Sequence, residues 1–305
     1  MTEWALRPIP RPRGVLREQV RAVALALRVP AIATAALLGV ATLMAIAEIL
    51  RGFDAIDFHP ERWVLPALAG ALLPIGVWMG EERFGGGFLW TLPVDRRGHA
   101  LAKVCAGWVW LMAAVAVLVL WLLVLALVSG GNVLGEETLR FIPPADVPPS
   151  GVIDPAAVRS VRWRPEPILW LTPFTSATAV YLLASALLLG VRHPLRWIVG
   201  TALGFVLVTA AFNEIGAAAN SHPLALAPSY LLQWLVYGRY GLGTLLIAGT
   251  ESLRLDTTDT NGDLTAVWTG LPDPGPWAVA TLLWTGAGLL ALWAAASRHR
   301  ERRRA

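Results

Sequence analysis

Six long uncharged runs constrain this chain more than any other feature of its sequence. None of them contains an Asp, Glu, Lys or Arg, and they cover residues 29–47, 63–80, 104–128, 168–191, 197–213 and 277–297. A helix crosses the hydrocarbon core of a bilayer with about 20 apolar residues, within a usual range of about 17 to 25. Backbone polar groups in lipid must be satisfied within the segment, which favours helices for runs this apolar. The runs therefore predict six transmembrane helices, over approximately residues 29–49, 63–80, 102–128, 168–191, 196–214 and 276–297.

The composition agrees with a membrane location. Apolar residues make up 56% of the chain and charged residues 15%, whereas soluble domains carry about 25% charged residues. No polar block is long enough for a separate soluble domain, so residues 1–305 are predicted to form one all-α integral membrane domain. The net charge is +4, but the basic residues flank the apolar runs and form no single stripe. This pattern argues against nucleic-acid binding.

The Lys and Arg residues predict which segments face the cytoplasm. With six spans and an inner N-terminus, the inner segments hold 17 basic residues and the outer segments 8, as the positive-inside rule requires. A seventh span within residues 215–238 would move the basic C-terminal tail outside and bring an acidic loop inside. We therefore expect both termini in the cytoplasm. Residues 215–249 are expected to form re-entrant or interfacial helices on the outer side.

The segments between the runs have distinct characters. Apolar positions 15, 16, 20, 23 and 27 recur at helical spacing among charged residues, which predicts an amphipathic interfacial helix. The outer loop 129–167 is rich in Pro and Gly, so we expect it to be irregular, with a short helix near residues 155–161. The second outer loop, 215–275, ends in an acidic stretch.

Several residues within the runs carry structural expectations. Pro66, Pro74 and Pro173 are expected to bend their helices. Gly200 and Gly204 form a GxxxG pattern, which favours a helix–helix contact, and the spacing from Gly70 to Gly76 also permits close approach of helices. The single Cys105 lies inside a run and is expected to be buried.

Recognisable catalytic motifs are missing from the sequence. It contains no GxxxxGK[ST], HExxH or GxSxG pattern, and all five histidines lie outside the six runs. We therefore predict that the chain is not an enzyme and binds no metal or cofactor itself. Ionisable or polar groups near the outer ends of spans are Glu48, Asn213 and Glu214. They are interfacial groups touching water, or they line the outer exit of a path through the membrane.

The connector between the second and third runs, residues 81–101, carries the most specific motif. From Gly80 to Lys103 the sequence is GEERFGGGFLWTLPVDRRGHALAK. The segment from Thr91 to Arg97, followed by Lys103, resembles the cytoplasmic loop of ABC-2 type transporter permeases. The wider layout is also similar to that family, with a basic amphipathic N-terminal helix, six spans, outer helices between spans five and six, and a short basic tail. The outer loop between spans three and four is longer and richer in proline than in minimal members.

The resemblance implies a permease subunit of an ATP-binding cassette transporter in a bacterial inner membrane. Such a permease binds a separate ATPase subunit, which holds ATP and Mg²⁺, and works with a second permease copy or a paralogue. The connector residues expected to contact that ATPase are Glu81, Glu82, Arg83, Phe88, Leu89, Trp90, Asp95, Arg96 and Arg97. The other interpretation is that Arg96, Arg97 and Lys103 bind the headgroups of membrane lipids.

The substrate is not defined by any motif. Apolar walls without membrane-buried charges favour a hydrophobic or amphipathic substrate over a small ion. A second functional hypothesis is a polytopic scaffold or assembly factor, whose outer loops 129–167 and 214–276 would bind another envelope protein.

Overall fold

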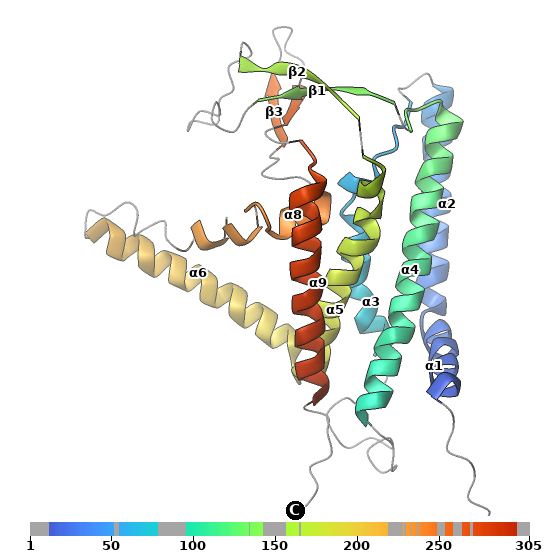
Figure 1. Cartoon of the computed structure of the whole chain (residues 1–305), viewed down its shortest axis with the longest axis vertical. Coiled ribbons are helices and arrows are strands. Elements are labelled where there is room, and N and C mark those ends of the chain that lie inside the picture. Colours follow the sequence, from blue (N-terminus) through green and yellow to red (C-terminus); the bar gives the residue numbers. More distant parts are fainter. Residues whose placement is uncertain are drawn as a thin grey trace, which may run out of the picture.

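A computed structural model describes most of the chain, and most of what it describes is helical (Figure 1). The described residues are 12–51, 55–78, 96–133, 135–142, 157–164, 166–218, 228, 230–232, 234–236, 238–248, 254–258, 264–268 and 271–297. Long helices run side by side and carry a small sheet at one end, called here the upper end as in Figure 1. One helix, α6, leaves the bundle at an angle.

Five described helices are long and apolar enough to cross a membrane. They are α2 (Arg28–Leu50), α4 (Arg96–Ser129), α5 (Thr172–Gly190) with the preceding 3₁₀ turn η5 (Pro167–Leu171), α6 (Pro194–Ala218) and α9 (Pro274–Ser297). The helix α3 (Leu65–Val77) is equally apolar but has 13 residues. These helices confirm a largely helical, multi-pass membrane protein. A sixth crossing by α3 stays a prediction, because residues 79–95 lie outside the described part of the chain.

The core forms around α5. This helix packs against α3 on one side and α9 on another, and also contacts α4. Small residues allow the close approach: a Cβ added at Gly70 of α3 would collide with the carbonyl oxygen of Ala177, and one at Gly288 of α9 would lie 2.8 Å from the Cβ of Leu182. The expected close approach at Gly70 is confirmed.

The other expectations about residues within the helices have mixed outcomes. A Cβ at Gly200 or Gly204 of α6 would meet no atom within 4 Å, so this GxxxG makes no contact with another described helix of the chain, and a contact with a second chain stays a prediction. Two further expectations are wrong. Pro66 and Pro173 lie in the first turns of α3 and α5, where the proline ring is tolerated without a bend; Pro74 alone lies inside its helix. Cys105 is exposed on α4, on a surface that faces lipid or another chain.

The N-terminal helix α1 (Pro12–Ala26) uses its apolar face to pack on the bundle. Val23 is 1% exposed, and Val20 and Leu27 are partly buried in the same core. The indole of Trp110 on α4 donates a hydrogen bond of 3.0 Å to the carbonyl oxygen of Val20. Arg21 and its partner Glu18 remain exposed. The predicted amphipathic helix is present, and protein covers part of its apolar face, since Leu16 is 39% exposed. Its location at the membrane interface stays a prediction.

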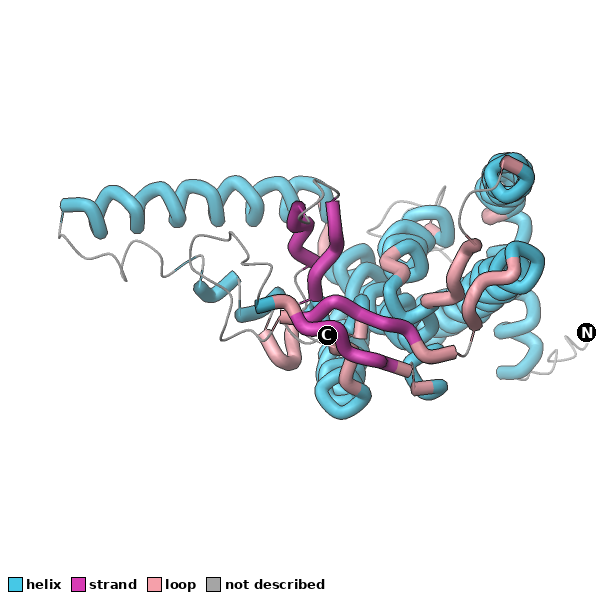
Figure 2. Tube along the Cα trace, turned by 90° about the horizontal axis from the view of Figure 1, so that it is seen from above, coloured by secondary structure: helices cyan, strands magenta, loops and turns pink. Residues whose placement is uncertain are grey.

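A four-stranded sheet lies over the upper end of the bundle, as the view from above shows (Figure 2). Its strands are β1 (Glu137–Phe141), β2 (Arg159–Trp163), β3 (Arg254–Thr258) and β4 (Leu264–Trp268), in the order β2-β1-β4-β3. Two antiparallel hairpins, one from each outer loop, join where β1 pairs in parallel with β4 at Phe141 and Trp268. The short helix expected near residues 155–161 is wrong for residues 159–161, which belong to β2, whereas residue 157 lies in a 3₁₀ turn. The alternation Val161, Arg162, Trp163 is typical of a strand.

The segment after α6 is only partly described. The helix itself extends to Ala218, four residues past the expected end of the span, and a short helix, α8 (Leu242–Ile247), then packs against α9 and α5. Whether residues 215–249 are re-entrant or interfacial stays a prediction.

Candidate functional site

The predicted connector site is described only where it continues into α4. Residues 79–95 lie outside the described part of the chain, and with them Glu81, Glu82, Arg83, Phe88, Leu89, Trp90 and Asp95. Residues 96–101, expected within the connector, instead form the first turns of α4. No proline follows Pro93 until the end of α4, so nothing in the sequence prevents the helix from starting this early. Arg96 and Arg97 therefore lie on a helix, and a force on them acts directly on α4.

Arg97 contacts the last helix of the bundle. Its guanidinium carbon lies 5.9 Å from the ring centroid of Trp293 on α9. A guanidinium over an indole face contributes about 0.5–2 kcal/mol, with the larger values in desolvated sites. The contact joins the start of α4 to the end of α9.

Lys103 is enclosed where α3 ends. It is 5% exposed, and its Nζ atom lies 4.8 Å from the ring centroid of Trp78, which follows the last residue of α3. The interpretation of Lys103 as a headgroup ligand is therefore wrong, because its side chain is covered by protein. We call Trp78, Arg97, Lys103 and Trp293 the lower cluster; these residues link α3, α4 and α9.

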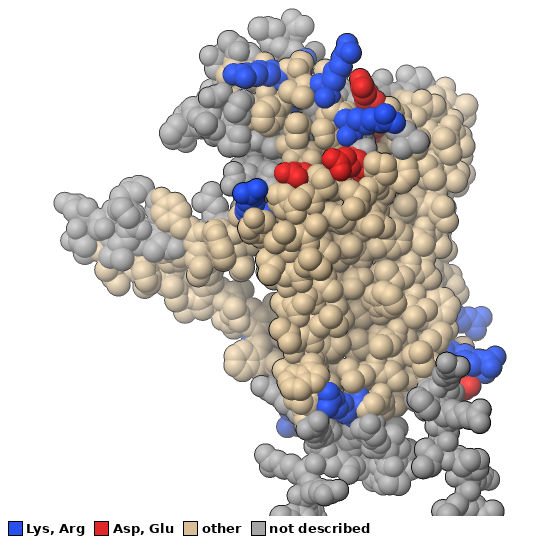
Figure 3. Space-filling view, viewed as in Figure 1, with Lys and Arg blue, Asp and Glu red and all other residues tan. Residues whose placement is uncertain are grey.

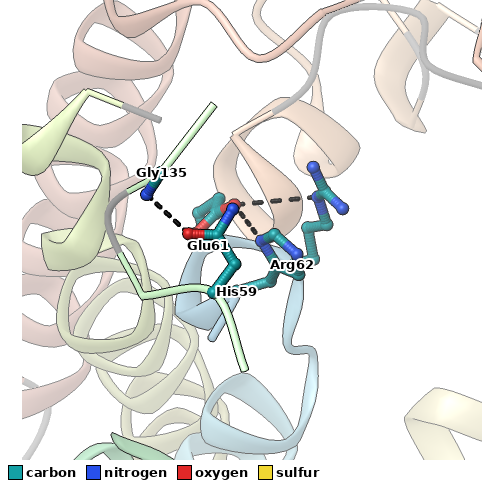
Figure 4. A network of polar contacts seen from close by, with 5 residues as sticks. His59, Glu61, Arg62 and Gly135 are labelled. Carbon is teal, nitrogen blue, oxygen red and sulfur yellow. Dashed lines mark hydrogen bonds and ion pairs between the residues drawn. The ribbon is translucent and has the colours of Figure 1, made fainter. Parts of the chain in front are cut away.

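A second polar cluster, shown in Figure 4, lies next to strand β2 of the sheet. The 3₁₀ turn η1 (Pro60–Arg62) carries Glu61, whose side chain is 0% exposed. Its Oε1 atom lies 3.5 Å from Nδ1 of His59 and 3.7 Å from Nε of Arg62. Neither carboxylate oxygen has a hydrogen bond to a described residue. The guanidinium carbon of Arg62 also lies 5.5 Å from the ring centroid of Trp163 in β2. We call His59, Glu61, Arg62 and Trp163 the upper cluster; its contacts connect η1 to the sheet.

Hydrogen bonds fix the loop that carries the upper cluster. The N–H of Phe58 donates to the carbonyl oxygen of Asn132 (2.9 Å), and the N–H of Asn132 donates to Asp57 Oδ1 (2.7 Å). The side-chain oxygen of Asn132 in turn accepts a hydrogen bond from the N–H of Gly135 (Figure 4).

The sequence analysis did not predict a role for Glu61, because one carboxylate in a short link gives no sign that it will be buried.

The structure does not bring the predicted outer-path residues together. Glu48 is exposed on α2, and Asn213 and Glu214 are exposed on α6. The two helices lie at opposite sides of the molecule in both views (Figures 1 and 2). A path lined by all three residues would require more than one chain.

The charges are distributed as in a membrane protein. The face shown in Figure 3 has a broad band without Lys, Arg, Asp or Glu. Residues of both signs, mostly basic, lie below this band, and residues of both signs lie above it around the sheet. The band matches the apolar layer that a bilayer requires.

The described residues include no group of three His, Cys, Asp or Glu side chains that could hold a metal ion. Comparison with known proteins adds no family: neither a protein-family model, nor a curated protein, nor a solved structure matches this chain. Function is therefore proposed from the residues and their geometry.

Proposed function

We propose that this chain is the transmembrane permease subunit of an ATP-binding cassette transporter, powered by a separate ATPase subunit. The observation that carries the proposal is the motif from Thr91 to Arg97, whose last two residues begin α4, the longest of the described helices. At 34 residues, α4 extends roughly 50 Å at 1.5 Å per residue. A displacement of the connector would therefore reach the opposite side of the membrane.

The lower cluster supports a coupled movement of several helices. Lys103 contacts Trp78 after α3, and Arg97 contacts Trp293 on α9. Closure of two ATPase subunits against the connector would then move α3, α4 and α9 together. ATP and Mg²⁺ would be bound by the ATPase, and this chain would supply the path and the mechanical link.

The proposal includes six spans with the connector and both termini on the cytoplasmic side of a bacterial inner membrane. Basic residues below the charge-free band support this orientation (Figure 3). The membrane-crossing windows of α2 and α6 are 0% buried, so both helices have apolar faces available for a second permease copy or a paralogue. The uncharged band also favours a hydrophobic or amphipathic substrate.

The test is the ATPase activity of the assembled complex. We would co-express the chain with an ATPase subunit encoded beside its gene, and compare the purified complex with the ATPase alone. The variants Glu82→Lys and Arg96→Glu are expected to weaken ATPase binding about thirtyfold or more, since reversing a charge at an interface costs about 2 kcal/mol or more. Arg17→Glu, an exposed position on α1, serves as the matched control. Failure of any ATPase to co-purify or to be stimulated would contradict the proposal.

The scaffold hypothesis gains support from the sheet. It joins segments of both predicted outer loops. Among the described strands, β2 and β3 each have one neighbour, so each offers an edge that another chain could extend. If the chain is a scaffold, replacing residues 254–268 by a Gly/Ser linker should abolish partner binding. If it is a permease, the same replacement should leave ATPase stimulation unchanged, and loss of the connector charges should have the larger effect on that stimulation.

A further inference from the structure

Strand β2 forms one edge of the sheet at the upper end of the bundle. In the order β2-β1-β4-β3, its one described neighbour is β1. Every second residue of an edge strand directs its backbone N–H and C=O away from the sheet, where they can pair with another strand. No backbone hydrogen bond between described loops or turns involves residues 159–163. Among the described residues, the outer side of β2 therefore offers backbone groups to a further strand.

Three arginines mark this edge. Arg159 and Arg162 lie in β2 and Arg164 follows it directly, and all of these side chains are exposed. No ion pair joins any of them to a described carboxylate, including Glu166, the acidic residue closest to them in the sequence. Figure 3 shows basic side chains standing over the sheet at the upper end of the described surface. The edge therefore presents guanidinium groups that no described carboxylate pairs with.

The two faces of β2 differ in character. Side chains alternate between the faces of a strand, so Ser160 and Arg162 share one face and Arg164 continues it. Val161 and Trp163 share the other face, and both are partly buried. The ring of Trp163 packs against buried residues of the bundle. One face of the edge is therefore polar and positive, and the other is apolar and turned toward the bundle.

A strand that extends this edge must match both faces. Opposite charges across a strand pair stabilise it, and like charges destabilise it. Pairing of β2 with β2 of a second copy would bring arginines close to arginines, and charged edge strands prevent self-association in this way. A segment with a carboxylate at every second position would instead meet Arg162 and Arg164, and its apolar residues would lie beside Val161 and Trp163. A polyanion without a peptide backbone would use the arginines but not the outward backbone groups.

We propose that β2 binds an extended acidic segment of a partner protein by strand addition. The segment alternates acidic and apolar residues and becomes a fifth strand of the sheet, beside β2. The arginines select an acidic partner, and the backbone groups of β2 hold it in an extended conformation. The proposal rests on the exposed edge and not on the ATPase-linked function, so failure of either one leaves the other standing.

Fluorescence anisotropy with synthetic peptides tests the edge on the full chain, purified in an uncharged detergent. The probe is a fluorescein-labelled peptide of about nine residues, the length of a strand, that alternates Glu with Val. A second peptide has Lys in place of each Glu. Two further peptides keep the Glu–Val sequence and carry N-methyl groups either on every Glu or on every Val. In strand addition one set of N–H groups faces β2 and the other faces solvent, so one methylated peptide should lose binding and the other should keep it.

The arginines are tested by charge reversal. Each exposed ion pair is expected to contribute about threefold to the affinity. The variant Arg162→Glu with Arg164→Glu should therefore bind the Glu peptide about tenfold more weakly, and the unchanged chain should bind the Lys peptide about tenfold more weakly than the Glu peptide. Arg192→Glu with Arg239→Glu is the matched control, because both arginines are exposed outside the sheet and the total charge changes equally. It should bind the Glu peptide as the unchanged chain does.

Several results would overturn the proposal. They are no binding of the Glu peptide at about 1 mM, equal binding of the Glu and Lys peptides, and unchanged affinity in the variant of Arg162 and Arg164. Full binding of both methylated peptides would reveal a site for any polyanion and would have the same consequence. So would a dimer of the unchanged chain that the variant separates, because β2 would then pair with a second copy. If the variant fails to fold, the methylated peptides decide on the unchanged chain.

Discussion

The contact of α4 with α5 depends on one residue without a side chain. The hydroxyl of Tyr181, which is 1% exposed, donates a hydrogen bond of 2.8 Å to the carbonyl oxygen of Val104. A Cβ on Gly107 would collide with that hydroxyl and would lie 2.9 Å from Cγ2 of Val77. Three helices therefore meet at Gly107, because only glycine leaves room for the tyrosine.

Replacing Gly107 by Ala should destabilise the protein. Overpacking a tight core typically costs about 1–3 kcal/mol, which thermal unfolding in detergent would measure. Gly200→Ala is the control, since its Cβ would meet no described atom within 4 Å and should leave stability within about 0.5 kcal/mol. Tyr181→Phe alone should cost about 1 kcal/mol for the lost hydrogen bond. In the double variant the missing hydroxyl relieves the collision, so the combined loss should be smaller than the sum; an additive result would contradict the packing described.

Glu61 allows a second prediction at this scale. Glu61→Leu removes the anion that faces His59 and Arg62. Breaking a buried ion pair lowers the free energy of unfolding by about 3–5 kcal/mol. We expect a loss at the lower end of this range, because the side chain of Arg62 is 20% exposed. Hydrogen exchange should rise in residues 55–64 and 135–142. Glu136→Gln, at an exposed position, should change neither the free energy of unfolding nor the hydrogen exchange of these residues. A Glu61→Leu variant as stable as the parent would show that the upper cluster does not stabilise this end.

The sequence identified Arg97 and Lys103 as notable but did not identify their partners. Both residues contact tryptophans of other helices, Trp293 and Trp78. Fifteen tryptophans occur in the chain, and those near helix ends fit the aromatic belt of any membrane protein. Which ring meets which cation is decided by packing between distant segments.

At the scale of elements, helices could be predicted and the sheet could not. An uncharged run defines its own helix in lipid, because its hydrogen bonds are local. The sheet joins hairpins from two outer loops through the single parallel pair of Phe141 and Trp268. Each strand has five residues, a length at which alternation is weak evidence, and the pairing is non-local.

The register of β1 and β2 predicts which pair of engineered cysteines would form a disulfide. Thr138 is opposite Arg162, both side chains are exposed, and opposite residues in antiparallel strands have Cβ atoms about 4.5–5.5 Å apart. In a Cys105→Ala background, Thr138→Cys with Arg162→Cys should form a disulfide in intact cells, seen as a mobility shift without reductant. Thr138→Cys with Ser160→Cys, a diagonal pair about 7–8 Å apart, should remain reduced. Oxidation of the diagonal pair alone would contradict the register. Oxidation only after lysis would contradict an outer location.

At the scale of the whole molecule, the angle of α6 is the feature that local patterns could not indicate. The helix follows a short turn after α5 and departs from the bundle (Figure 1). Its membrane-crossing window is 0% buried, so no contact within the described chain fixes its direction. Its surroundings, lipid or a second chain, must therefore determine its final tilt.

The number of crossings can be tested on this helix. His193 lies exposed between α5 and α6, and Arg239 lies exposed after α6. With six spans, a cysteine at position 193 should react with a membrane-impermeant maleimide only after permeabilisation, whereas one at position 239 should react in intact cells. Both variants need the Cys105→Ala background, because Cys105 is itself exposed.

Ser297→Cys, at the end of α9, completes this test. Six spans require it to react only after permeabilisation, like the cysteine at 193, whereas a seventh span after α6 would expose it in intact cells. If positions 193 and 239 are labelled from the same side, either α6 does not cross the bilayer or a second crossing follows it before residue 239. In the first case the apolar face proposed for a second permease copy would lie at the membrane surface. In that case the basic residues of the C-terminal tail could not be used to orient the chain.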